Sequence, residues 1–126
     1  LPDWKGNNRL DSLKNIVEDG RLSLMFMVPG SDTVVRINGE AIVTADNDVT
    51  GAFERDGKLP CTVTVITVSE VYFQCAKALM RSGLWQVGDA STKIPTAGEF
   101  LQEQAPEFAA ASYDEGYLQY AKERLW

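Results

Sequence analysis

Hydrophobic residues near the beginning of the chain recur with the spacing of an amphipathic helix. Leu10, Leu13, Ile16 and Val17 fall on one face of a helix that runs to about Glu18, so this face is expected to contact a core.

The residues on either side of this helix predict its two ends. Asn7 or Asn8 is suited to the N-cap, because a short side-chain oxygen can accept a hydrogen bond from the first backbone N–H groups. Asp19-Gly20 ends the helix, with Gly20 as the expected left-handed cap residue.

Three segments have the pattern of β-strands: Arg21–Val28, Thr33–Thr44 and Thr62–Phe73. The turn Pro29–Asp32 separates the first two. The middle strand alternates apolar and polar residues, and Gly39 within it predicts a bulge or the close approach of another backbone or a ligand.

The remaining periodic segments predict four short helices, over residues 46–53, 74–81, 96–103 and 113–125. Thr96 and Glu99 form a capping box at the start of the third. Strands flanked by short helices indicate a mainly β, α+β fold, with a mostly antiparallel sheet or barrel and peripheral helices.

Composition narrows the function classes. The chain has 126 residues and a net charge of −6, which argues against general binding to nucleic acid or to an anionic membrane. The sequence contains no histidine, which excludes a Ser-His-Asp or Cys-His hydrolase within this chain and argues against a zinc site.

Cys61 and Cys75 flank one predicted strand, too far apart for a disulfide. With neither a signal peptide nor an apolar run of about 20 residues, a cytoplasmic location is expected.

The start of the first helix carries the clearest candidate chemistry. Asn7, Asn8 and Ser12 supply neutral donors and Arg9 supplies a positive donor fork, at a helix end whose free N–H groups favour an anion such as phosphate. The alternative is an ordinary capped helix with a solvated Arg9.

Three blocks of sequence, Trp4–Leu13, Val35–Ala41 and Val71–Trp85, occur in the order found in pyridoxamine 5'-phosphate oxidase-like flavoproteins. Together they resemble that family, and more narrowly a bacterial branch of it. The third block is the most specific, with the string Phe-x-Cys-x-Lys-Ala-x-x-Arg-Ser-x-Leu-Trp.

The resemblance implies a split β-barrel homodimer with FMN at the subunit interface. It implies that residues 1–104 are the C-terminal portion of the flavin-binding domain, with two or three further strands before Leu1. Residues 105–126 are then a helical tail that packs on the barrel or on the dimer partner. The segment Asn7–Arg9 matches the family's phosphate-binding segment, where the oxidase has a Ser-Arg-Lys pattern.

In this context four more residues become candidates for flavin binding. Arg36 could reach the electron-rich edge of the flavin, or pair with Glu40 on the same strand face. Lys77 and Arg81 lie four residues apart on one helix face and could face the flavin from the other subunit, or be an exposed pair near Glu70 or the acidic tail. Trp85 is the fourth candidate, and it could stack on the flavin or pack in a core or interface.

The sequence therefore supports two hypotheses. The first is an FMN-dependent oxidoreductase that acts on an unknown small substrate, with no assigned catalytic residue. The alternative is a non-enzymatic module of the same fold that binds or senses a flavin, or only dimerises.

Overall fold

The computed structural model describes residues 1–6, 8–91 and 94–123 of the chain. Residues Leu1–Trp85 form one compact unit and residues Gln86–Trp126 form a second. The elements are β1 (Pro2–Asp3), α1 (Asp11–Glu18), β2 (Arg21–Met27), β3 (Val34–Thr44), α2 (Asn47–Gly51), β4 (Thr62–Gln74), α3 (Lys77–Ser82), α4 (Ala97–Gln104) and α5 (Ala110–Lys122).

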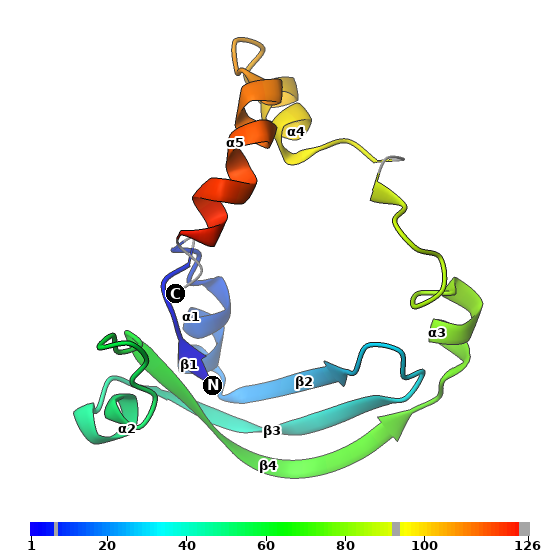
Figure 1. Cartoon of the computed structure of the whole chain (residues 1–126). Helices are drawn as coiled ribbons and strands as arrows, with labels where there is room; N and C mark the ends of the chain where they lie inside the picture. The colour runs from blue at the N-terminus through cyan, green and yellow to red at the C-terminus, as the bar shows by residue number, and fades with distance from the viewer. Residues whose placement is uncertain (7, 92–93, 124–126) are drawn as a thin grey trace. The chain divides into compact units, whose positions relative to one another are not determined.

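The first unit is built on one four-stranded antiparallel sheet in the order β1-β4-β3-β2. The long strands curl into a half-barrel, with α1 beside β1 at one end and α3 following β4 at the other (Figure 1). The fold is thus α+β with an antiparallel sheet and peripheral helices, as the sequence predicts.

The strand predictions are confirmed, and Gly39 marks the irregularity that its sequence position suggests. The β3–β4 register shifts between Asn38 and Gly39, so that Asn38 pairs with Glu70, Gly39 pairs with Val68, and Ser69 is the extra residue. A Cβ atom on Gly39 would lie 2.3 Å from the carbonyl oxygen of Thr67, so only glycine allows the two backbones to approach this closely.

The helix ends agree less closely with the sequence pattern. The N-cap residue of α1 is Leu10, which makes no side-chain capping hydrogen bond, so Asn8 is not the cap. Asp19 at the C-cap is extended, and Gly20 instead allows the chain to pass close to Ala41, whose N–H donates to the Gly20 carbonyl at 2.7 Å.

The second unit pairs α4 with α5. The predicted capping box is present, because Thr96 Oγ1 accepts from the Glu99 N–H at 3.1 Å and Glu99 Oε2 accepts from the Thr96 N–H at 2.7 Å. Helix α5 begins at Ala110, three residues earlier than predicted, and the predicted end at residue 125 lies outside the described residues. By contact, α4 belongs with α5 rather than with the sheet.

The core of the described chain is small. Four apolar residues are buried, Val34, Ala41 and Val63 in the sheet and Ala110 in α5. Helix α1 contacts β3, but Val17 is 71% exposed, so the prediction that its whole apolar face contacts a core is wrong. The reason is that α1 meets the sheet mainly beside β3, where it covers part of a single layer.

One face of the sheet is apolar across all three long strands. The register places the even-numbered residues of β2 and the odd-numbered residues of β3 on this face. On β4 the bulge changes the alternation, so even-numbered residues up to Val68 and odd-numbered residues from Val71 lie on it. We call this the apolar sheet face; its residues are Leu22, Leu24, Phe26, Val35, Ile37, Gly39, Ala41, Val43, Thr64, Ile66, Val68, Val71 and Phe73.

None of these residues is charged. Several are widely exposed: Phe73 is 77% exposed, Val71 61% and Val68 52%. Phe26 and Val35 are also exposed. Among the described residues, no helix is both long and hydrophobic enough to cross a bilayer.

Candidate functional site

A small cavity lies where the sequence predicts phosphate binding. Its volume is about 300 Å³, and it is formed by three stretches of chain: β1 and the residues after it, the residues before α1, and the residue before β4. Its lining residues are Asp3, Trp4, Lys5, Gly6, Asn8, Arg9, Leu10 and Cys61.

The backbone at this cavity is shaped by an asparagine in the left-handed region. Asn8 has φ 61°, a conformation that asparagine tolerates better than most other residues. It therefore acts in the turn before α1, two residues ahead of the helix N-cap, and not as the cap itself.

Arg9 lines the cavity and carries an ion pair. Its Nε donates to Asp11 Oδ2 at 3.3 Å, and both side chains are largely exposed. The guanidinium is thus held near the mouth of the cavity by a carboxylate from the first residue of α1. Such an exposed pair is weak enough for another anion to compete with it.

Of the four residues predicted at this helix start, the structure brings Asn8 and Arg9 to the cavity. Ser12 is exposed in the first turn of α1 and is not among the lining residues. Asn7 lies outside the described residues.

Arg36 lies on the opposite face of the sheet from the apolar sheet face. Its Nη1 donates to Gln74 Oε1 at 3.2 Å and contacts Met25 Sδ at 3.9 Å. The alternative that Arg36 pairs with Glu40 is not found among the described residues, because Arg36 instead bonds across the strands to residues near its own register position. The Arg36 Nε is buried and has no hydrogen-bond partner in the described part of the chain.

Lys77, Arg81 and Trp85 lie after the end of β4. Arg81 is exposed and its Nε donates to the Lys77 carbonyl oxygen at 3.2 Å, which holds its side chain along α3. Trp85 is half-buried and its indole Nε1 donates to the Ser31 carbonyl oxygen at 2.8 Å. This bond fastens the segment after α3 to the turn between β2 and β3.

The predicted residues therefore form two groups at opposite ends of the sheet. Cys61, at the cavity, immediately precedes β4, whereas Tyr72, the register partner of Arg36, lies near its end. The intervening strand is on the order of 35 Å long at about 3.3 Å per residue. A single mononucleotide bound at the cavity does not span this length within one chain.

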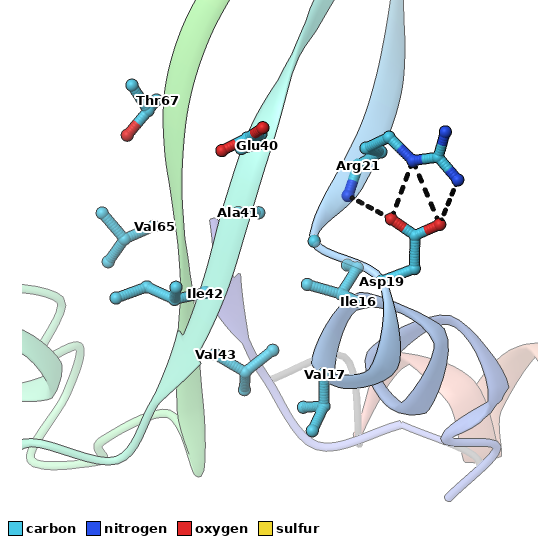
Figure 2. A pocket seen from close by; sticks show the side chains of 11 residues that line it. Ile16, Val17, Asp19, Arg21, Glu40, Ala41, Ile42, Val43, Val65 and Thr67 are labelled. Atoms are coloured by element: carbon cyan, nitrogen blue, oxygen red, sulfur yellow. Dashed lines mark hydrogen bonds and ion pairs between the residues drawn. The ribbon is translucent and has the colours of Figure 1, made fainter.

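A second and larger cavity, of about 750 Å³, lies at the sheet edge between α1 and β3. Figure 2 shows Ile16 and Val17 on one side of β3, with Ile42 and Val65 pointing to the other. The lining includes Asp19, at the C-cap of α1, and Arg21, the first residue of β2, which are joined by a bidentate ion pair with an Nη2–Oδ2 distance of 2.5 Å.

Hydrogen bonds from the Arg21 side chain lower the pKa of Asp19 from 3.8 to about 2. The charges of Asp19 and Arg21 satisfy each other, and Glu40 and Thr67 are the other polar side chains in a lining that is otherwise apolar.

Sequence reasoning did not identify Lys5 or Cys61 as site residues, although both line the smaller cavity. Lys5 could have been found from its position four residues before Arg9, in the same polar segment. Cys61 reaches the cavity because β4 pairs with β1, a pairing that the two-residue strand β1 gives no pattern to predict.

Both cysteines are free, as predicted from their positions at the two ends of β4, and both are exposed. Within the described residues no cluster of three or more potential metal ligands occurs.

The chain matches no family model, no curated protein and no solved structure.

Proposed function

We propose that this chain is the flavin-binding part of a split-barrel, FMN-dependent oxidoreductase that acts on a small molecule as a homodimer. The observation that carries the proposal is the cationic cavity at the predicted phosphate segment, lined by Arg9 and Asn8. A phosphate monoester carries about −1.5 to −2 charges at neutral pH, and an arginine fork suits its oxygens.

The size of the cavity suits one end of the cofactor. About 300 Å³ is at the lower limit for ligand pockets and matches the phosphate end of a mononucleotide better than the whole molecule. The flavin ring would then lie outside this cavity, at a site that a second subunit completes.

The apolar sheet face supports the dimer. The five most exposed of its residues present on the order of 500 Å² of apolar surface, which is comparable to the largest apolar patch of a typical monomer and is a large part of one partner's share of a stable interface. The face carries no charge, so two copies that each carry −6 can meet there without direct repulsion. A second copy is the proposed occupant, because an uncharged apolar face is complementary to itself across a two-fold axis.

Lys77 and Arg81 place two cations beyond the end of β4. Arg36 lies on the other face of the sheet from the proposed dimer contact, and its buried Nε has no hydrogen-bond partner among the described residues. When bound, FMN supplies the two-electron redox chemistry, and these side chains bind and orient it and exclude water.

The test combines a spectrum with a mass. The full chain is titrated with FMN while flavin fluorescence is followed, and its mass in solution is measured by light scattering. Saturable binding by a dimer supports the proposal, and Arg9→Ala should weaken binding at least fivefold. Protein that is colourless after incubation with excess FMN and removal of the unbound flavin overturns the proposal.

Phe73→Glu tests the occupant of the apolar sheet face, because it places a charge where 77% of the side chain is exposed. It should give a folded monomer. A wild-type chain that is already monomeric, with Phe73 protected by another segment of the same chain, would rule out the second copy.

The second candidate is a non-enzymatic flavin-binding or dimerisation module, favoured by the ion pair that already occupies Arg9 and by the apolar sheet face. Anaerobic addition of NADH or NADPH separates the two. Bleaching of the bound flavin supports the oxidoreductase, and binding without reduction by either donor supports the module.

A further inference from the structure

The small cavity contains a second cation besides Arg9. Lys5 lines it from the segment after β1, whereas Arg9 lines it from the segment before α1. Lys5 is exposed and takes part in no hydrogen bond or ion pair within the described residues, so its ammonium donors are available to a ligand.

Two carboxylates lie in the lining or next to it, and each has a partner. Asp3 Oδ2 accepts a hydrogen bond from the Thr62 hydroxyl at 3.4 Å, and Asp11 pairs with Arg9. Lys5 is therefore the cation at this site that is not already neutralised by a described carboxylate.

We propose that Lys5 is a second phosphate ligand of this cavity and that it acts together with Arg9 on one phosphate monoester. The assignment of FMN as that monoester rests on the proposed function. A doubly charged phosphate is better matched by two cations than by one, and the two residues supply different geometries. The Arg9 fork fixes the direction of two oxygens, while the Lys5 ammonium acts as a movable point charge.

Cys61 provides a direct reporter of the occupied cavity. Cys61 is exposed and lines the same cavity, and the other cysteine of the chain, Cys75, lies at the far end of β4. In a Cys75→Ser background, the alkylation rate of the single remaining thiol therefore measures access to this cavity without any assay of activity.

The experiment measures FMN and riboflavin affinity, and the alkylation rate of Cys61 with and without inorganic phosphate. Lys5→Gln should weaken FMN binding about three- to tenfold, as expected for loss of one charged contact near the surface, and leave riboflavin affinity unchanged. It should also reduce the protection of Cys61 by phosphate. Lys5→Arg should restore both. The matched control is Lys14→Gln, which removes the same charge from an exposed position of α1 outside the cavity.

The outcomes distinguish the role of Lys5 as a phosphate ligand from the proposed flavin-binding function. If Arg9→Ala weakens FMN binding but Lys5→Gln behaves like Lys14→Gln, the role of Lys5 is refuted and the flavin function stands. If wild-type protein binds no FMN, the function fails, and phosphate protection of Cys61 still decides the role of Lys5. Equal protection in wild type and Lys5→Gln refutes it, and protection lost in Lys5→Gln supports it.

Discussion

Arg9 and Asp11 form an ion pair at the mouth of the cationic cavity, with 3.3 Å between Nε and Oδ2. Because the pair is exposed, it is worth about 0.2–1 kcal/mol and must be at least partly given up when a phosphate takes the guanidinium. Asp11→Asn should therefore raise the affinity for FMN by up to about fivefold. Fluorescence titration measures this gain.

The same substitution in an Arg9→Ala background is the control. There the gain should disappear, since the carboxylate has no guanidinium to compete for. An equal gain with and without Arg9 would show a general effect of charge and contradict competition at this residue.

Arg36 should contribute more to binding than to stability. Its buried Nε has no partner in the described chain, so replacing the side chain removes an unsatisfied donor together with the bond to Gln74. Arg36→Met is expected to change the free energy of unfolding by less than about 1 kcal/mol and to weaken FMN binding. Urea unfolding and FMN titration test the two parts, and unchanged FMN affinity would remove Arg36 from the flavin site.

The bulge depends on the absence of a side chain at Gly39. Gly39→Ala places a Cβ 2.3 Å from a backbone oxygen, so the strands must separate, and the loss of stability should be about 2 kcal/mol or more. Gly51→Ala is the matched control, because a Cβ there meets no atom within 4 Å and should be neutral or slightly stabilising. Thermal unfolding measures the melting temperatures of both variants. Equal values would mean that the close approach of the two backbones at Thr67 is not rigid.

Asp114 fastens the start of α4 to α5. Its carboxylate accepts from Thr96 Oγ1 at 2.5 Å and from the Gly98 N–H at 2.9 Å. Asp114→Ala leaves both donors without this acceptor and should destabilise the pair of helices by about 1–3 kcal/mol. Amide exchange in α4 is the measurement, with faster exchange expected in Asp114→Ala and not in the exposed control Glu115→Ala.

The Asp19–Arg21 pair predicts a specific acid dependence. Hydrogen bonds from Arg21 lower the pKa of Asp19 from 3.8 to about 2 in the folded chain. The folded-state value is the lower one, so the stabilisation is present above pH 4 and is lost as the pH falls from about 4 to 2. Urea unfolding across this interval should show a shallower loss in Asp19→Asn than in wild type, small because the pair is exposed. Arg21→Gln should have the same effect; a difference between the two variants would assign the acid dependence to another partner.

Much of the fold follows from local patterns. Three local patterns predict features that the structure contains: the β-branched run before Gln74, the turn at Pro29–Asp32 and the capping box at Thr96. Gly39 was predicted at a bulge because glycine in an alternating strand usually marks one.

The parts that the sequence could not predict depend on pairing over long distances. Position 69 holds the extra residue of the bulge, and it changes which residues of β4 share a face. Val68 and Val71 lie on the same face although they are an odd number of positions apart. A simple alternation cannot show this. The place of Cys61 beside Arg9 likewise depends on β1 meeting β4, and the partners of Arg36 come from neighbouring strands rather than from Glu40 on its own.

The two thiols that bracket β4 give the chain a built-in pair of spectroscopic labelling positions. Spin labels on Cys61 and Cys75 would report the end-to-end length of this strand, and hence how tightly the sheet is rolled in solution. Mixing labelled with unlabelled chains would separate distances within one copy from distances between copies. The native sequence can therefore report on its own curvature and self-association without an engineered cysteine.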